Sequence, residues 1–196
     1  MKKKIIFLIL SILFSQIAIY YVNFREKDNN DSQLKDIIVD NLPYFNGLDR
    51  LYDLLSFPPI FLNLLYFEYL PIDKLIVNIG IIYLLRGLCI LTTTIPKFKT
   101  CHIEHNNLQS LFSGGCYDKI FSGHIAFVIT FILYLINFTD QKKYKIIYFL
   151  YIVVGSILSF ITESHYSIDV LLSWIISITL FLTLNKNIDI SGIILN

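Results

Sequence analysis

Charged residues are scarce in this chain. Asp, Glu, Lys and Arg make up only 16% of its 196 residues, whereas a soluble domain normally carries about 25%. The 16 basic residues nearly balance the 15 acidic ones, so the basic excess of a nucleic-acid-binding protein is missing. Repeats are also absent. These absences argue against a soluble domain and a nucleic-acid partner. The high hydrophobic content, 55% of the chain, indicates a membrane protein.

The hydrophobic residues gather in six blocks, each close to the roughly 17–25 residues that cross a bilayer core. The blocks are residues 5–22, 54–70, 75–95, 122–138, 146–161 and 166–184. Pro58 and Pro59 interrupt the second block, but neighbouring helices can satisfy backbone groups that proline frees in a membrane helix. We therefore predict an all-α fold, with residues 1–196 forming one integral membrane domain of six transmembrane helices.

The N-terminal block fits two functions, because three lysines before an apolar run are typical of signal peptides and of membrane anchors. Bulky residues at 20–24 replace a small-residue cleavage site, so we expect an anchor. Lys2–Lys4 and the lysines at 142–145 lie an even number of crossings apart, which predicts that both are cytoplasmic. The loops at 23–53, 96–121 and 162–165 then face the lumen or the exterior.

This orientation predicts where glycans attach. The Asn30-Asp-Ser acceptor is then on the outer face, and the Asn137-Phe-Thr acceptor is at an inner helix end. A glycan on Asn137 and none on Asn30 would indicate the opposite orientation. Apolar residues within 36–57, including Tyr52, fit either an amphipathic surface helix or a polar linker with incidental leucines.

Two histidine motifs stand at the outer starts of the fourth and sixth blocks. They are Cys116-Tyr-Asp-Lys-Ile-Phe-Ser-Gly-His124 and His165-Tyr-Ser-Ile-Asp169. Asp169 follows His165 by one helical turn, so it can accept a hydrogen bond from one imidazole nitrogen and leave the other as a nucleophile. His124 can protonate a leaving oxygen. The alternative is that these are ordinary interfacial histidines, but their motif neighbours favour catalysis.

Four further residues are candidates for binding the substrate. Ser122 and Gly123 open a helix whose free N–H groups can bind an anion, and glycine lets a phosphate approach closely. Asp118 fits a hydrogen bond to an imidazole or to a polar group of the substrate, or a plain loop aspartate. Lys119 fits either neutralisation of a phosphate or a solvated loop charge.

The pattern Ser-Gly-His followed by His-x-x-x-Asp resembles the type 2 phosphatidic acid phosphatase (PAP2) superfamily, whose members use the second histidine as nucleophile through a phosphohistidine. The longer motifs resemble its sphingomyelin synthase branch, which has Cys-Gly-Asp-x-x-x-Ser-Gly-His-Thr and His-Tyr-Thr-x-Asp-Val. Arg86 and the Thr-Thr-Ile-Pro at 93–96 resemble a third element of that branch. The resemblance covers residues 80–175 and implies a six-helix, PAP2-like bundle.

The departures from the family pattern also carry information. Tyr117 replaces a glycine and Ile125 a threonine. The Lys-x6-Arg-Pro and Ser-Arg elements of the lipid phosphatases are missing, and Leu158 and Ser159 hold the Ser-Arg positions. The resemblance therefore implies a sphingomyelin synthase-type phosphotransferase acting without cofactor or metal, with a glycerophospholipid donor, a ceramide-like acceptor, and an active site on the lumenal or exofacial side. The alternatives are a lipid phosphatase that uses water and a non-catalytic lipid-binding protein.

Other polar residues are harder to assign from the sequence. Arg86 lies about 15 Å from the outer end of its block at 1.5 Å per residue, which predicts a structural arginine at least as readily as a phosphate ligand. The cluster His102-Ile-Glu104-His105 is too short to predict a metal site, although Glu104 could serve as an accessory acid. We expect Cys101 and Cys116 to be free thiols, with a disulfide between them as the alternative.

Overall fold

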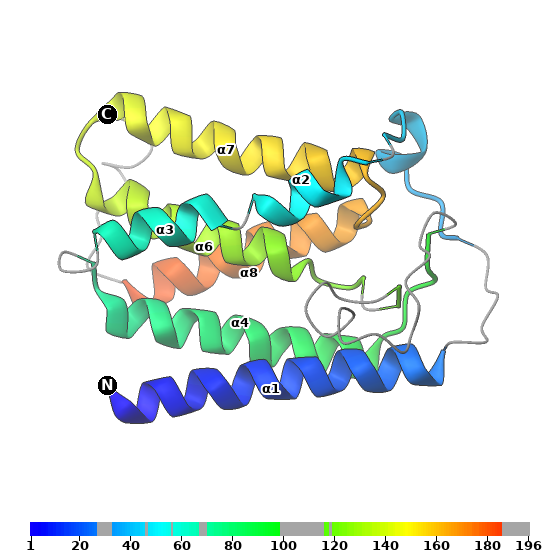
Figure 1. Cartoon of the computed structure of the whole chain (residues 1–196), viewed down its shortest axis with the longest axis horizontal. Coiled ribbons are helices and arrows are strands. Elements are labelled where there is room, and N and C mark those ends of the chain that lie inside the picture. The colour runs from blue at the N-terminus through cyan, green and yellow to red at the C-terminus, as the bar shows by residue number, and fades with distance from the viewer. Residues whose placement is uncertain are drawn as a thin grey trace.

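The computed structural model describes residues 1–26, 33–45, 47–55, 57–66, 70–98, 116–117 and 119–185 (Figure 1). Within these ranges every regular element is a helix. The elements are α1 (Lys2–Arg25), the 3₁₀ turn η1 (Val39–Asn41), α2 (Asp49–Leu54), α3 (Phe57–Leu65), α4 (Ile72–Thr92), α6 (Gly123–Phe138), α7 (Lys142–Ile161) and α8 (Ser167–Leu184). The predicted all-α fold is confirmed.

Four of these helices, α1, α4, α7 and α8, are long and apolar enough to cross a membrane. Helix α6 is a shorter apolar helix, and so is the stretch Leu51–Leu65. Many large apolar side chains on the outer helices are exposed, among them Leu10, Ile147 and Ile175. Exposed apolar faces on long apolar helices are what a lipid environment requires, so the chain is a multi-pass membrane protein.

The second hydrophobic block differs from the prediction, because it forms two helices, α2 and α3. Helix α2 ends at Leu54 and α3 begins at Phe57, directly ahead of Pro58-Pro59, because the first turn of a helix tolerates residues that have no N–H donor. Asn63 then donates through Nδ2 to the carbonyls of Pro59 at 2.8 Å and Phe131 at 3.2 Å. This buried amide satisfies carbonyls of both helices and fastens α3 to α6.

The region 36–57 is not one amphipathic surface helix, and it is not a loose linker either. Its regular elements are η1 and α2, and the Tyr52 side chain is buried with only 4% exposed. The Phe45 amide donates to the Ile161 carbonyl at 2.9 Å, and the Tyr151 hydroxyl donates to the Leu55 carbonyl at 2.6 Å. Both ends of the α2 region are therefore fixed to α7.

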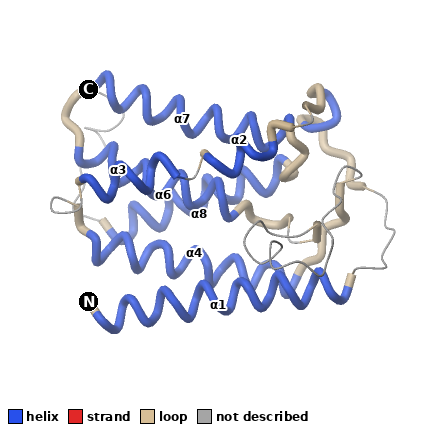
Figure 2. The backbone as a smooth tube through the Cα atoms, in the orientation of Figure 1, coloured by secondary structure: helices blue, strands red, loops and turns tan. Residues whose placement is uncertain are grey.

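Helices α1 and α4 run side by side along the bundle (Figures 1 and 2). A Cβ on Gly80 or Gly87 would lie 2.6 Å or 2.7 Å from the rings of Phe7 and Phe14. Small residues at helix interfaces permit this close approach in membranes. The ion pair from Lys4 to Asp73, 2.9 Å long, joins the starts of the two helices, so they are parallel.

Helix α6 occupies the centre and packs against α3, α4, α7 and α8. Most of its side chains are buried. The starts of α6 and α8 lie at the same end of the bundle as the ends of α1, α4 and α7 (Figure 1). This arrangement brings the two histidine motifs together although about 40 residues separate them.

Candidate active site

His165 lies in the tight turn between α7 and α8, and only 6% of it is exposed. The amides of Ser164 and His165 both donate to the Ser159 carbonyl, at 3.0 Å and 3.4 Å. Glu163 has a positive φ of 49°, which an L-residue adopts at a cost. The turn is thus anchored to the last residues of α7 and sets the position of the imidazole.

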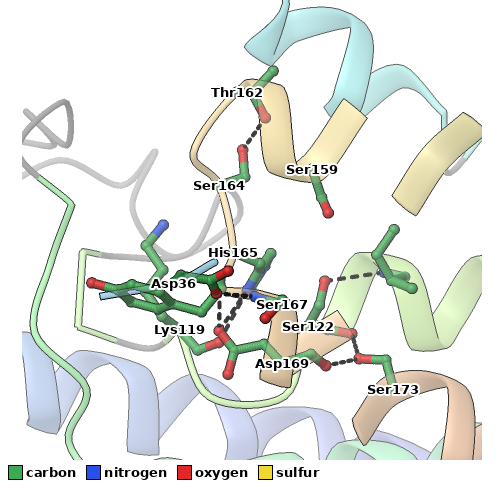
Figure 3. Close-up of polar contacts among 12 residues, drawn as sticks. Asp36, Lys119, Ser122, Ser159, Thr162, Ser164, His165, Ser167, Asp169 and Ser173 are labelled. Carbon is green, nitrogen blue, oxygen red and sulfur yellow. Dashed lines mark hydrogen bonds and ion pairs between the residues drawn. The ribbon is translucent and has the colours of Figure 1, made fainter. Parts of the chain in front are cut away.

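A backbone carbonyl fixes the tautomer of His165. Its Nδ1 lies 3.0 Å from the Lys119 carbonyl oxygen (Figure 3). Because a carbonyl oxygen can only accept, Nδ1 must carry a proton, and in the neutral imidazole Nε2 then holds the lone pair. The structure therefore leaves Nε2 as the basic and nucleophilic nitrogen of His165.

Asp169 is placed differently from the prediction. Its Oδ2 lies 3.7 Å from His165 Nδ1, too far for a hydrogen bond, and instead accepts from the Tyr166 amide at 3.1 Å. The carboxylate is fully buried, and among the residues that the structure describes its Oδ1 has no hydrogen-bond partner. Asp169 caps the start of α8 and puts a negative charge beside the imidazole, while the Lys119 carbonyl takes the hydrogen bond that we assigned to Asp169.

Ser122 joins the two motifs. As the N-cap of α6, its Oγ accepts from the Ile125 amide at 3.3 Å, and it lies 3.1 Å from the Tyr52 hydroxyl. The Ser122 carbonyl accepts from Ser173 Oγ of α8 at 2.9 Å. The fully buried Ser122 therefore connects α2, α6 and α8, and it begins the fourth predicted helix as its N-cap.

His124 is also preceded by a residue with a strained backbone. Phe121, just ahead of the Ser-Gly-His turn, has a φ of 62° and is completely buried. Its side chain packs with Ile82 and Ala126, and that packing holds the unfavourable conformation in place. In the described chain, the non-glycine residues with positive φ are Phe121 and Glu163. Each stands within three residues of a motif histidine.

Arg86 reaches the site, contrary to the depth argument. A Cβ built on Gly123 would lie 2.8 Å from Arg86 Nε and 3.1 Å from its Cδ, so the guanidinium side chain lies directly against the Ser-Gly-His turn. Arg86 is buried, and its Nη1 donates to Ser15 Oγ of α1 at 3.4 Å. A cation beside the start of α6 adds to the positive end of the helix dipole, and both favour a bound phosphate.

This contact explains the glycine and can be tested. We expect Gly123→Ala to lower the free energy of unfolding by about 1–3 kcal/mol, as overpacking does, and to weaken activity by displacing Arg86. Gly155→Ala in α7 is the matched control, because its Cβ would meet only side-chain atoms at 3.8 Å and alanine favours the helix. Thermal unfolding in detergent measures both variants. Equal stability of the two would contradict the Arg86 contact.

Tyr52 is a site residue that sequence reasoning did not find. Its ring lies between the two histidines, with ring centroids 5.4 Å from His124 and 6.4 Å from His165. The adjacent Asp53 has its Oδ1 3.7 Å from His124 Nε2. A tyrosine on an apolar stripe carries no local signal of such a role, because only the docking of α2 brings it to the motifs.

The remaining candidates have mixed outcomes. Lys119 is buried, which disagrees with a solvated loop charge, and its backbone carbonyl orients His165. Cys116 is disulfide-bonded and Cys89 is a free thiol, so the expectation of a free Cys116 was wrong. Five residues whose roles the sequence left open lie outside the described residues: Cys101, His102, Glu104, His105 and Asp118.

Asp36 secures the start of α8 from a distant loop. Its Oδ2 accepts from the Ser167 amide at 2.6 Å (Figure 3). Its Oδ1 accepts from the Ile38 and Val39 amides. Burial raises the pKa of this carboxyl, but the N–H donors of Ser167, Val39 and Ile38 outweigh burial and lower the pKa below its ordinary value of 3.8.

The lowered pKa of Asp36 predicts how stability depends on pH. The stabilisation is complete above 3.8, the ordinary value, and is lost as the pH falls through the lower folded pKa. We expect Asp36→Asn to cost about 1 kcal/mol at neutral pH, as loss of a helix cap does, and the difference from wild type to vanish in strong acid. Unfolding measured as a function of pH tests this, and a difference independent of pH would contradict it.

The fold and site define a class: an all-helical, multi-pass membrane protein with paired histidine motifs at one end of its bundle. Residues 115–186, which include both histidines, match the PAP2 superfamily C-terminal family. This match confirms the resemblance of that part of the chain to the PAP2 superfamily.

The relatives are plant enzymes. The chain is 30% identical over 98 residues to the phosphatidylinositol:ceramide inositolphosphotransferase of Oryza sativa subsp. japonica, which covers 46% of this chain and 30% of the rice protein. It is 33% identical over 60 residues to phosphatidylinositol:ceramide inositolphosphotransferase 2 of Arabidopsis thaliana, covering 31% of this chain and 20% of that protein. The aligned region thus spans less than a third of these relatives.

Proposed function

We propose that this protein is a membrane phosphotransferase of the sphingomyelin synthase type. It would move a phospho-head-group from a glycerophospholipid to a ceramide-like alcohol. The observation that carries the proposal is the free Nε2 of a buried histidine whose Nδ1 is held by a backbone carbonyl. The buried Asp169 carboxylate lies beside it, the Tyr52 ring contacts both His165 and His124, and Arg86 lies against the helix start at Gly123.

The reaction proceeds in two half-reactions. His165 Nε2 attacks the phosphorus of the donor, the bond from phosphorus to the diacylglycerol oxygen breaks, and His124 gives that oxygen its proton. The negative charge of Asp169 stabilises the positive charge that develops on the His165 ring. In the second half-reaction, the hydroxyl oxygen of the acceptor attacks phosphorus while His124 takes the proton of that hydroxyl. The bond from phosphorus to His165 Nε2 then breaks. No metal or nucleotide is needed for either step.

Arg86 and Gly123 support binding of the phosphate. The guanidinium lies against a turn that has no side chain of its own, so the phosphate oxygens can approach both the cation and the first N–H groups of α6. The Ser-Arg element of the lipid phosphatases is missing here, and the buried Ser159 holds its arginine position. This difference favours a lipid acceptor over water. Asp118 and Lys119 remain proposed contacts of the head group.

The head group is either phosphocholine or a relative of it, and the names of the plant proteins point to phosphoinositol as the first relative to test. The purified protein in liposomes should convert fluorescent ceramide to a phosphosphingolipid with one of three donors: phosphatidylcholine, phosphatidylethanolamine or phosphatidylinositol. Release of free head-group phosphate without a new sphingolipid would establish the phosphatase alternative. Lipid binding without turnover would establish a non-catalytic protein.

We also propose that the site faces the lumen or the exterior. The support is that the lysine-rich segments at 2–4 and 142–145 both lie at the end of the bundle away from the histidines. Expression in cells that attach N-glycans should modify Asn30 and leave Asn137 bare. The reverse pattern would place the active site on the cytoplasmic side.

A further inference from the structure

Helix α2 brings a second carboxylate to the site. Asp53 Oδ1 lies 3.7 Å from His124 Nε2, the same separation that Asp169 Oδ2 has from His165 Nδ1. The two pairs differ in their exposure. The side chains of Asp53 and His124 are 49% and 31% exposed, whereas those of Asp169 and His165 are 0% and 7% exposed. One imidazole–carboxylate pair is therefore internal and the other lies at the mouth of the site.

The position of Asp53 is set by the docking of its helix. The adjacent Tyr52 is buried, and its hydroxyl lies 3.1 Å from Ser122 Oγ. The hydroxyl of Tyr151 holds the Leu55 carbonyl at the end of α2. Because contacts on either side of Asp53 immobilise the backbone, the carboxylate stays close to His124 and loses little entropy in doing so.

We propose that Asp53 is the positioning residue of His124, an inference that rests on the proposed function. A general acid must be protonated when the leaving oxygen departs, and a carboxylate within 4 Å stabilises the imidazolium form. Asp53 keeps His124 charged until its proton passes to the diacylglycerol oxygen. It stabilises the imidazolium again when His124 takes the proton of the acceptor hydroxyl. Asp53 itself exchanges no proton with either lipid.

Exposure sets the size of the expected effect, since solvent weakens a half-exposed pair. Asp53→Asn should lower kcat on the order of tenfold with an unchanged KM for the donor, because proton transfer and not binding is affected. The basic limb of the pH–rate profile should move to lower pH, because less of His124 stays protonated. Among the residues that the structure describes, Arg86, Lys119 and the pair of His165 with Asp169 are the other charged groups near the turn, and this variant leaves them unaltered.

Two further variants complete the series. Asp53→Glu keeps the charge and should recover most of kcat. Asp140→Asn is the matched control, because it removes a carboxylate from an exposed position at the opposite end of α6 and should behave as wild type. A wild-type kcat in Asp53→Asn, or a raised KM with unchanged kcat, would overturn the proposal. The second result would make Asp53 a head-group ligand.

A second measurement does not depend on turnover. Diethyl pyrocarbonate reacts with the neutral imidazole, so at pH 6 the His124 peptide should be modified several-fold faster in Asp53→Asn than in wild type. Mass spectrometry of the digested protein reports this, with the buried His165 as an internal reference. If the wild type transfers no head group, the proposed function fails, while a faster modification would still establish the pairing. Equal modification rates would overturn the pairing itself.

Discussion

His165→Asn should lose head-group transfer by a factor on the order of 10³–10⁵, the range seen when an enzyme nucleophile is removed. Asparagine is chosen because its Nδ2 can replace imidazole Nδ1 as the donor to the Lys119 carbonyl, while nothing replaces Nε2. The change therefore removes the nucleophile and keeps the hydrogen bond that holds the turn. We expect the thermal unfolding midpoint to change little.

The companion variant His165→Gln separates chemistry from structure. Its longer amide does not match Nδ1, so the hydrogen bond to Lys119 should be lost and the unfolding midpoint should fall. Transfer measured in liposomes and unfolding measured in detergent together decide the case. If His165→Asn retained a tenth or more of wild-type transfer, His165 would not be the nucleophile, and the assignment would pass to His124.

Asp169→Asn should have the second large effect: it should lower activity without lowering stability. Transfer should fall at least about a hundredfold, because the negative charge beside the His165 ring is lost. The amide oxygen can still accept from the Tyr166 amide, so the cap of α8 survives. A buried charge is costly when one of its oxygens has no partner, as Asp169 Oδ1 has none in the described part of the chain. The variant should therefore be as stable as wild type or more stable.

The measurement is a paired one, with transfer rate and unfolding midpoint determined on the same preparations. Ser173→Ala serves as a structural comparison, because it removes hydrogen bonds to the Asp169 and Ser122 carbonyls without changing the charge. It should lower stability more than Asp169→Asn and activity much less. A strongly destabilised Asp169→Asn protein would mean that the carboxylate serves the fold and not the reaction.

The sequence predicted the parts of this molecule that local pattern determines. Hydrophobic blocks located the helices, and motif spacing placed both histidines at helix starts at one end of the bundle. The missing parts depend on groups without a local signature. The Lys119 carbonyl is a backbone atom that any residue would supply, and Tyr52 and Asp53 reach the site only through the tertiary docking of α2.

Arg86 shows how a small error in a boundary changes a functional conclusion. The predicted block ended at Ile95, but α4 ends at Thr92, and Thr93 has extended backbone. Arg86 therefore lies about 9 Å from its helix end at 1.5 Å per residue. Gly123 begins α6 alongside that arginine. Depth measured along one helix only placed Arg86 too deep for a phosphate contact. The sequence does not show where the neighbouring helix α6 begins.

The region that matches the PAP2 family is smaller than the set of helices that surrounds the candidate site. Residues 115–186 contain both histidines and Asp169, yet Arg86 comes from α4, its partner Ser15 from α1, and Tyr52 from α2. A fragment cut at the boundary of the matched region would keep every motif residue and lose the cation that faces them. Evolutionary comparison therefore marks where the chemistry is encoded, while the helices before it determine whether that chemistry can operate.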